Sequence, residues 1–521
     1  MKTFYVENFG CRATQADGAA LAGQFRDRGL EQVASFSQAQ IVVVNTCTVT
    51  EAADQDARTV IRRIQRVNPN CRIVVTGCYA QRAPEELAGL PGVAQVIGNS
   101  HKHRLVDIAI SGADGAEPER RGETTAREIT DFVPVSRLNP GTNRRTSDPA
   151  RSTPGEPAPI FVSDIFAHTE LVAPLVDAAQ ERTRPILKVQ DGCDNRCSFC
   201  VIPSVRGSSR SLPLGRILEE LNRLIAAGYR EVVLSGINLG RWGRDLPRSE
   251  FGTRTSETPR RRSLRLEDLV RSILTHTSLE KLRISSVEPM DWTDELIQRV
   301  AESPRIAKHA HVPLQSASDR ILRGMHRKYR PWHYREKILA LREAMPAAAI
   351  GADVMVGFPG ETDHDFGETH RMVEELPFTY LHVFPYSPRP GTEAASMGEQ
   401  VPVKVAEERS RILRQLAGEK KLAFMRSLIG QSLAAITLDF RARRENQDAR
   451  VSTGDGHFTE ALTDNYLKLR LKGEYEPNRW LQAEIEDVKD GMLIGSARAS
   501  VKETEPVPRG PGNRSLVLVR R

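Results

Sequence analysis

Residues 189–203 read ValGlnAspGlyCysAspAsnArgCysSerPheCysValIlePro and place Cys193, Cys197 and Cys200 within eight residues, in the pattern CxxxCxxC. Three thiolates at this spacing can hold one face of a [4Fe–4S] cluster and leave its fourth iron open for an external ligand. A structural zinc site is the alternative, but it needs a fourth Cys or His at the usual spacing, and none is nearby. The pattern therefore favours an iron–sulfur cluster with one open iron.

A second group of three cysteines, Cys11, Cys47 and Cys78, lies upstream, and each of them follows a predicted β-strand. The strands are predicted over residues 4–9, 41–45 and 72–76. Helices are predicted between them, and repeated strand–helix units are typical of a parallel, doubly wound sheet. Parallel strands end at one shared edge, where such sheets bind ligands. We therefore expect the three thiols to meet at that edge.

Cys71 is an internal control for this argument, because it lies just before its strand and so falls on the opposite edge. We predict that Cys71 is not a ligand. Three thiolates at one edge fit a second iron–sulfur cluster with one open iron. The alternative is three unrelated core cysteines, since a free Cys often packs as a small hydrophobic residue. The shared strand-end position favours the cluster.

The composition indicates a multidomain protein of the cytosol. The chain has 521 residues, which predicts about three domains. Hydrophobic residues make up 39% and charged residues 27%, with a net charge of +7 that permits nucleic-acid binding without requiring it. No run long and apolar enough for a membrane span occurs, and the N-terminus lacks the features of a secretory signal. Seven cysteines in so long a chain argue against a disulfide scaffold.

Two internal segments are predicted to be exposed insertions. Residues 111–160 hold seven prolines and five glycines with few apolar side chains, which is typical of a flexible linker. Residues 241–263 hold seven arginines against three acids and little that could be buried. Between and after these segments lie a long α/β region, a stretch of alternating strands and a polar tail.

The amino-acid sequence around the cysteines resembles that of a known enzyme family. CxxxCxxC followed by repeated strand–helix segments resembles the radical S-adenosylmethionine superfamily, and the preceding Cys11/Cys47/Cys78 region resembles the methylthiotransferases within it. The matching stretches are SerGlyIleAsnLeuGly (235–240), ArgIleSerSerValGluPro (283–289), HisValProLeuGln (311–315), ValGlyPheProGlyGluThr (356–362) and TyrSerProArgProGlyThr (386–392). Within the family, AsnThrCysThrValThr (45–50) and ThrGlyCysTyrAlaGln (76–81) are most similar to the branch that acts on threonylcarbamoyladenosine in tRNA.

The resemblance implies a fold of three parts: an N-terminal doubly wound parallel sheet, a central partial (β/α) barrel of the radical S-adenosylmethionine type, and a small C-terminal all-β domain. The expected divisions are an N-terminal methylthiotransferase domain with an auxiliary cluster (1–110), a linker or insertion (111–160), the radical S-adenosylmethionine core (179–410), a TRAM-like β domain (428–499) and a tail (502–521).

It also implies a transferase with two [4Fe–4S] clusters and S-adenosylmethionine, which the open iron of the Cys193/Cys197/Cys200 cluster binds for cleavage to a radical. The expected reaction converts N6-threonylcarbamoyladenosine, next to the anticodon of tRNA, to its 2-methylthio derivative. One S-adenosylmethionine gives the methyl group and a second yields the radical that abstracts the C2 hydrogen. The Cys11/Cys47/Cys78 cluster carries the sulfur.

Other substrates and roles stay open at this point. The family also contains branches that act on isopentenyladenosine in tRNA or on a ribosomal protein, and the chain could instead be a non-catalytic iron–sulfur or zinc protein that binds RNA. The expected partners are a tRNA and a reducing electron donor, in the cytoplasm and without a membrane. The sequence does not identify the sulfur source.

Five further residues are candidates for cofactor or substrate contacts. Gly236, Ser286 and Glu288 lie at predicted strand ends, where barrels place cofactor contacts, although turn glycines and capping residues would look the same. His311 and Gln315 are either substrate or cofactor contacts or elements of local structure.

Basic residues could contact RNA. Arg58, Arg62 and Arg66 share one helical face, for which a solvated surface is the simpler interpretation. The C-terminal β domain resembles the small RNA-binding domain often appended to this family, on the basis of Phe458, Tyr466 and Lys468–Lys472.

The chain departs from the family's usual text at two places: Thr14 stands where Asn is frequent, and Ala317 where Gly is more usual. We expect neither residue to touch a ligand cysteine.

Overall fold

The computed structural model describes residues 2–114, 157–168, 171, 183–246, 263–439 and 458–498. Most of the predicted linker and insertion, and the predicted tail, lie outside these residues. The first unit is a six-stranded sheet in the order β2-β1-β3-β4-β5-β6, in which every neighbouring pair is parallel. Its strands are β1 (Thr3–Asn8), β2 (Glu31–Gln32), β3 (Ile41–Thr46), β4 (Arg72–Gly77), β5 (Val93–Gly98) and β6 (Ile160–Phe161).

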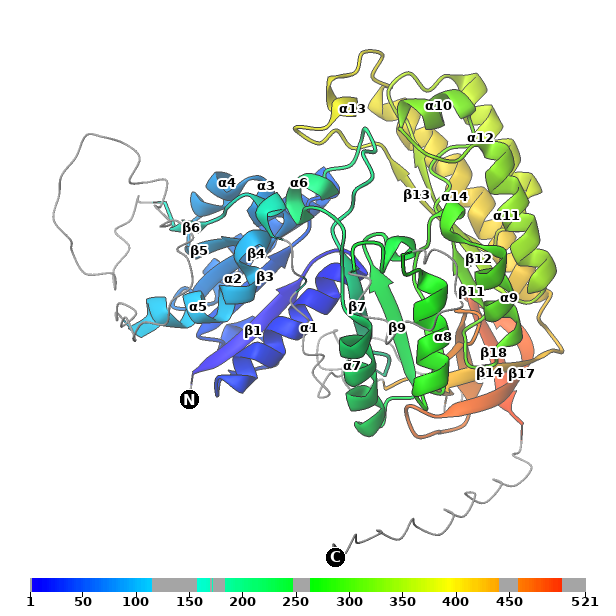
Figure 1. The fold of residues 1–521 in the computed structure, drawn as a ribbon, viewed down its shortest axis with the longest axis horizontal. Helices are drawn as coiled ribbons and strands as arrows, with labels where there is room; N and C mark the ends of the chain where they lie inside the picture. Colours follow the sequence, from blue (N-terminus) through cyan, green and yellow to red (C-terminus); the bar gives the residue numbers. More distant parts are fainter. Residues whose placement is uncertain are drawn as a thin grey trace, which may run out of the picture.

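Helices cover both faces of this sheet (Figure 1). Side chains of β3 alternate between two apolar cores: Ile41 and Val43 pack with helices α1 (Arg12–Asp27) and α5 (Leu105–Asp114), while Val42 and Val44 pack with α2 (Glu51–Val67). A strand buried on both faces is expected to be continuously apolar, as this one is. The short helices α3 (Cys78–Arg82) and α4 (Pro84–Ala88) follow β4. The doubly wound parallel sheet is confirmed.

The central unit is a curved sheet of two joined parts. Strands β10-β9-β7-β8 form one part and β11-β12-β13 the other, and parallel bridges from Leu282 to Ile306 and from Ser286 to His311 connect them. All pairs are parallel except β7 with the edge strand β8. The strands are β7 (Ile186–Asp191), β8 (Arg210–Ser211), β9 (Glu231–Gly236), β10 (Lys281–Ile284), β11 (His309–His311), β12 (Ala349–Val356) and β13 (Tyr380–Pro385).

The helices of this unit are α6 (Ile202–Arg206), α7 (Leu214–Ala226), α8 (Leu266–His276), α9 (Asp294–Glu302), α10 (Asp319–Gly324), α11 (Pro331–Ala344), α12 (Asp363–Glu375), α13 (Glu393–Ser396) and α14 (Val403–Arg426). Of these, α6 and α13 pack in two smaller apolar clusters. One large apolar core joins most of the strands to the other helices. On β12, Ala352 and Val354 face this core, so Asp353 between them faces the inner side of the curve. Among the described strands no pairing closes β13 onto β8. The expected partial barrel is confirmed.

One expectation about the central unit is wrong. Residues 241–263 were expected to hold little that could be buried, yet Trp242 is fully buried in the central core and donates its indole N–H to the Leu212 carbonyl at 2.9 Å. Arg241 and Arg244 both pair with the buried Asp291, at 3.2 and 2.9 Å. The arginine-rich composition predicted an exposed segment, but the segment contains one aromatic side chain, Trp242, that anchors its start in the core. Residues 247–262 lie outside the described part of the chain.

The C-terminal unit is a closed barrel in the order β14-β15-β16-β18-β17, which confirms the expected small all-β domain. Its strands are β14 (Ser432–Thr437), β15 (Phe458–Thr463), β16 (Lys468–Lys472), β17 (Trp480–Lys489) and β18 (Met492–Ala497). The barrel packs below β11 in Figure 1, while α1 lies between the first sheet and β7. Within the described ranges, no helix has the length and apolar character needed to cross a membrane.

Candidate active site

Cys11, Cys47 and Cys78 lie where β1, β3 and β4 end, and two glycines bring them together. Gly10 has a φ of +90°, and a Cβ there would lie 2.9 Å from the sulfur of Cys47. Gly77 has a φ of +100°, and a Cβ there would lie 2.3 Å from the Thr46 carbonyl oxygen. Only glycine allows these approaches without strain. The Gly-Cys pairs in FGC and TGC therefore allow the strand ends to meet.

The three thiols are close enough to repel one another as thiolates. Burial, followed by the charges of Cys78 and Cys11, raises the pKa of Cys47 to about 12. Three thiolates can share this space at neutral pH only if a positive centre neutralises them, as a bound metal does. Cys71 takes no part: it is buried at the start of β4 in the core beneath α2, and burial alone raises its pKa.

Cys193, Cys197 and Cys200 follow β7 in the same way, and several N–H groups point at their sulfur atoms. The Asn195 backbone N–H and the Asn238 side-chain amide donate to the Cys193 sulfur at 3.4 and 3.5 Å. Burial, with repulsion from Cys197, raises the pKa of Cys200 to about 12. Such donors are the means by which proteins stabilise cluster-bound sulfur and adjust its potential.

The spacing of the sulfurs suits clusters better than single ions. Among the described residues, neither cysteine trio has all three sulfurs within 4.8 Å of one another. Thiolates on one tetrahedral zinc ion lie about 3.8 Å apart, because each Zn–S bond is about 2.3 Å. The separation is therefore too wide for one zinc ion, and three thiols at each site are the donor set of an iron–sulfur cluster.

One buried arginine lies beside each trio, and neither arginine was predicted from the sequence. Arg327, 7% exposed, donates to the Cys197 sulfur at 3.3 Å and pairs with Glu288. Arg206, 2% exposed, lies near the first trio, where its charge opposes the rise in the pKa of Cys47. No local pattern marks either residue, because each reaches its cysteines through the tertiary fold.

Arg206 also belongs to a buried charge cluster that joins the first sheet to the central unit. Asp17 on α1 pairs with Lys188 of β7 and, at 3.1 Å, with Arg206. Asp191 pairs with the same two cations at 2.8 Å each. Burial alone would raise the pKa of Asp17, but Lys102, Lys188 and Arg206 lower it well below its usual value. The carboxylate therefore stays ionised and fixes α1 against β7.

Of the three predicted cofactor contacts, the structure places Glu288 close to the second trio. Gly236 ends β9, and a Cβ there would lie 3.0 Å from the Gln190 side-chain oxygen. Ser286 is half-buried beside His311 across the bridge from β10 to β11. Glu288 pairs with Arg327 and so lies one side chain away from Cys197. Their roles toward a cofactor remain predictions.

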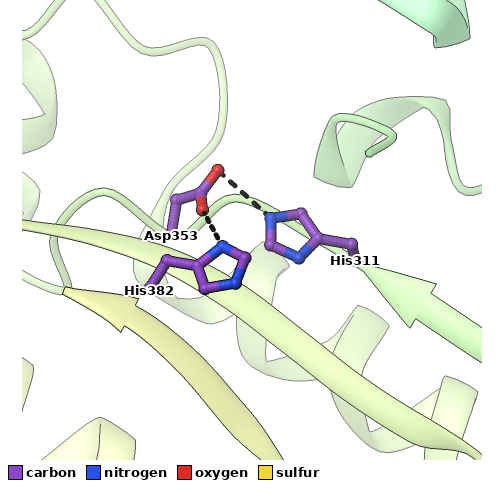
Figure 2. Close-up of side chains that lie close together, drawn as sticks. All are labelled: His311, Asp353 and His382. Atoms are coloured by element: carbon purple, nitrogen blue, oxygen red, sulfur yellow. Dashed lines mark hydrogen bonds and ion pairs between the residues drawn. The ribbon is translucent and has the colours of Figure 1, made fainter. Parts of the chain in front are cut away.

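His311 belongs to a polar group on the inner side of the curved sheet (Figure 2). Its Nε2 lies 3.1 Å from one Asp353 oxygen, and Nδ1 of His382 lies 3.1 Å from the other. Burial would raise the pKa of Asp353, but hydrogen bonds from His311 and His382 lower it below its usual value. The Tyr380 hydroxyl links His311 to the fully buried His309, at 3.0 and 2.7 Å. The group forms one polar wall of the barrel interior.

Gln315 combines a structural role with a free polar atom. Its φ is +62°, and its backbone bonds to Asp353 and Met355 at 2.8 and 2.9 Å across the sheet. Its side-chain oxygen is buried without a hydrogen-bond partner among the described residues. The backbone of Gln315 therefore has a structural role in the sheet, and its side-chain oxygen is also available to a ligand.

Thr14 was expected not to touch a ligand cysteine, and that expectation is wrong. Its hydroxyl lies 3.5 Å from the Cys11 sulfur, because the first turn of α1 folds residue 14 back over residue 11. Ala317 is buried, and its backbone N–H donates to the Thr369 hydroxyl at 3.0 Å. The departure at Thr14 thus lies within the first cysteine site.

Of the candidate residues of the RNA-binding surface, several are exposed and two are not. Arg62 and Arg66 are exposed on α2, whereas Arg58 is half-buried over the ring of Tyr79. Lys468 and Lys472 are exposed, as is Phe458. Tyr466 instead lies in a junction of all three units: its hydroxyl accepts from Arg12 at 3.0 Å, and its ring lies 4.9 Å from that of His309.

This junction anchors the C-terminal barrel. The guanidinium groups of Arg12, Arg184 and Arg283 all lie 5.2–5.8 Å from the centre of the Tyr466 ring. We expect Tyr466→Ala to lower the free energy of unfolding by about 3 kcal/mol, as loss of a well-packed aromatic ring does. Tyr466→Phe should cost about 1 kcal/mol, because only the hydrogen bond is lost. Urea denaturation measures both.

Phe458→Ala is the matched control, because it removes an aromatic ring that is 43% exposed on the same barrel. It should change the unfolding free energy by less than about 1 kcal/mol. Equal losses for Phe458→Ala and Tyr466→Ala would contradict the anchoring role of the junction.

Two family models match separate parts of the chain. Residues 3–98 match the Uncharacterized protein family UPF0004, and residues 187–373 match the Radical SAM superfamily. The first range contains Cys11, Cys47 and Cys78, and the second contains the CxxxCxxC cysteines.

Individual relatives match over nearly the full length. The threonylcarbamoyladenosine tRNA methylthiotransferase MtaB of Bacillus subtilis (strain 168) is 33% identical over 91% of this chain and 91% of its own. The tRNA-2-methylthio-N(6)-dimethylallyladenosine synthase of Novosphingobium aromaticivorans is 31% identical over 83% of this chain and 85% of its own. Among solved structures, a radical S-adenosylmethionine methyltransferase, TsrM, from Kitasatospora setae covers 76% of this chain and 74% of its own, with 15% identity and a TM-score of 0.49.

Proposed function

The chain belongs to the radical S-adenosylmethionine methylthiotransferases, and from this premise we propose that its substrate is N6-threonylcarbamoyladenosine in tRNA. The product is the 2-methylthio derivative of that nucleoside, next to the anticodon. The observation that carries the proposal is the pair of cysteine trios at the strand ends of two packed parallel sheets, each with its own buried arginine. The relatives named for this substrate support the choice within the family.

The reaction needs two separate sites because it needs two kinds of chemistry. An aromatic C–H bond requires a radical, and the inserted sulfur requires a separate soft-metal site. The chain carries two [4Fe–4S] clusters and uses S-adenosylmethionine, which together supply the radical, the methyl group and the sulfur. Cys193, Cys197 and Cys200 would hold one cluster by their three thiolates, and that cluster would supply the electron that cleaves S-adenosylmethionine.

The chain's own residues hold and orient these groups. Arg327 and Asn238 donate hydrogen bonds to the sulfurs of Cys197 and Cys193. Glu288 pairs with Arg327 and holds it in place. We propose that Gly236, Ser286 and Glu288 border the bound S-adenosylmethionine. Cys11, Cys47 and Cys78 would hold the second iron–sulfur cluster. The buried ion pairs that join Asp17 and Asp191 to Lys188 and Arg206 hold α1 of the first unit against β7.

The tRNA is proposed to lie across exposed basic residues of α2 and the C-terminal barrel, including Arg62, Arg66, Lys468 and Lys472. Phosphate contacts of this kind weaken as salt rises. Cleavage of S-adenosylmethionine also requires a reducing electron donor. We place the enzyme in the cytoplasm, where such a donor and tRNA meet.

Nucleoside mass spectrometry of tRNA from cells with and without the gene tests this function. We expect 2-methylthio-threonylcarbamoyladenosine to disappear in the deletion strain and its unthiolated parent to accumulate. Loss of 2-methylthio-isopentenyladenosine instead would transfer the chain to the branch of the dimethylallyladenosine synthases, which are also about 31% identical to it. No change in any tRNA nucleoside would point to a protein substrate or a non-catalytic role.

A further inference from the structure

A cavity of about 300 Å³ lies where the first sheet meets the central unit. Its wall comes from α1, the short helix that follows β5, the strand β7 and the segment around α6, so both units contribute to it. The volume is at the lower end of the range of small-molecule sites. It lies outside both cysteine trios.

The cavity carries an excess of positive charge. Among the described residues, four cations and two carboxylates line it. The cations are Lys102, Lys188, Arg206 and Arg210, and the carboxylates are Asp17 and Asp191. Both carboxylates are already paired with Lys188 and Arg206, and Asp17 is also paired with Lys102 at 3.0 Å. Arg210 donates only to backbone carbonyls of His168 and Arg206, so its charge has no carboxylate partner among the described residues.

Three polar groups in this wall also lack partners. The Nε atoms of Arg206 and Arg210 and the side-chain oxygen of Asn99 are buried without a hydrogen bond in the described part of the chain. Arg206 is 2% exposed, so its free N–H group is well shielded from solvent. A buried donor without an acceptor costs free energy, and a bound anion would remove that cost. The charge excess and the two free N–H donors of Arg206 and Arg210 both favour an anion, whereas the Asn99 oxygen is a hydrogen-bond acceptor and does not.

The same wall borders the first cysteine site. The Asn99 side-chain amide donates to the Cys78 sulfur at 3.6 Å. Lys102 and Arg206 both interact electrostatically with Cys78, and Arg206 also interacts with Cys11. An anion in the cavity would therefore lie one side chain away from the cluster that gives up sulfur.

We propose that this cavity binds a small anionic sulfur compound, hydrosulfide or a low-molecular-weight persulfide, that replenishes sulfur at the Cys11/Cys47/Cys78 site. The inference rests on the proposed function. Each product gains one sulfur, and the methyl group alone comes from S-adenosylmethionine, so every turnover after the first needs a new sulfur atom at this site. Binding in the cavity makes or breaks no bond. Hydrosulfide then supplies sulfur at the oxidation level of sulfide, whereas a persulfide releases its outer sulfur as sulfide only with two electrons from the reducing donor and leaves as the thiol. The charge of the anion is matched by Arg210, whose guanidinium donates only to backbone carbonyls among the described residues.

The test uses holoenzyme with both clusters, tRNA and S-adenosylmethionine, at increasing concentrations of sodium sulfide. For Arg210→Gln we expect the sulfide concentration at half-maximal rate to rise at least about tenfold, since a charge-assisted contact is lost. The first turnover, which uses sulfur already present, should keep its yield. Arg342→Gln is the matched control, because it removes the same charge from an arginine that also donates to backbone carbonyls, far from the cavity.

A second readout keeps the test independent of catalysis. Holoenzyme is mixed with ³⁵S-labelled sulfide, or with labelled cysteine persulfide in a parallel arm, and the retained label is counted after rapid desalting. Lower retention by Arg210→Gln than by Arg342→Gln supports the cavity, and the arm that shows it identifies the source. Equal retention and equal sulfide dependence in both variants would overturn the proposal. If wild-type enzyme gives no methylthiolated nucleoside in its first turnover, the proposed function fails, while the label still decides the cavity.

Discussion

Cys78→Ala is expected to remove one of two clusters and leave the other working. Iron should fall from about eight to about four atoms per chain, because each [4Fe–4S] cluster holds four. Methylthiolated nucleoside should become undetectable, since the Cys11/Cys47/Cys78 site loses a ligand. Reductive cleavage of S-adenosylmethionine to 5′-deoxyadenosine should persist, because Cys193, Cys197 and Cys200 are untouched. Iron analysis and chromatography of both products measure these outcomes.

Cys71→Ala is the matched control, made at the other end of the same strand. Cys71 is buried in the core beneath α2, and β4 separates it from Cys78. Removing its sulfur should cost about 1 kcal/mol of stability and leave iron and both products unchanged. Loss of iron from the Cys71 variant would contradict the prediction that the ligands lie only at the carboxyl edge of the sheet.

The gathering of ligands at the carboxyl edge of the sheet is the part of the site that could be predicted from the sequence. The run at 41–45 is nearly all β-branched, so it predicts a strand buried on both faces, and the structure has β3 over Ile41–Thr46. Once parallel order is inferred, the residues after each strand must share an edge. Local pattern and topology together therefore bring Cys11, Cys47 and Cys78 to one place without any tertiary information.

The charged partners of the cysteines could not be predicted in this way. Arg206 reaches Asp17 from 189 positions away, and Arg327 reaches Cys197 from 130 positions away. A long flexible side chain can pair with any carboxylate or sulfur that the fold brings near, so neither spacing nor composition marks it. Tyr466 is the extreme case: the resemblance to an RNA-binding domain rested partly on it, yet Arg12, 454 positions earlier, holds it in a junction. Strand-end chemistry follows from local pattern, whereas the supporting charges depend on packing.

The second large effect is expected at Arg327. Its guanidinium is almost fully buried and connects Glu288 to the Cys197 sulfur. Arg327→Gln removes a positive charge beside the cluster, so adding an electron there becomes less favourable and the reduction potential falls. Loss of a charge-assisted hydrogen bond of about 1.5–3 kcal/mol corresponds to a fall of roughly 60–130 mV for one electron. We expect 5′-deoxyadenosine formation to slow by at least about tenfold. A redox titration followed by electron paramagnetic resonance measures the potential directly.

Two variants separate this effect from damage to the fold. Arg327→Lys keeps the charge without the forked donors, so it should recover part of the potential but not all of the rate. Arg323→Gln, on α10, removes an exposed arginine whose ion pair with Asp319 is 2.8 Å long, and it should change neither quantity. If Arg327→Gln slowed cleavage while the potential stayed at the wild-type value, the arginine would act by holding Glu288 in place rather than through the cluster. In that case Glu288→Gln alone should slow cleavage by a similar factor, again with the potential unchanged, because it removes the carboxylate that the arginine positions.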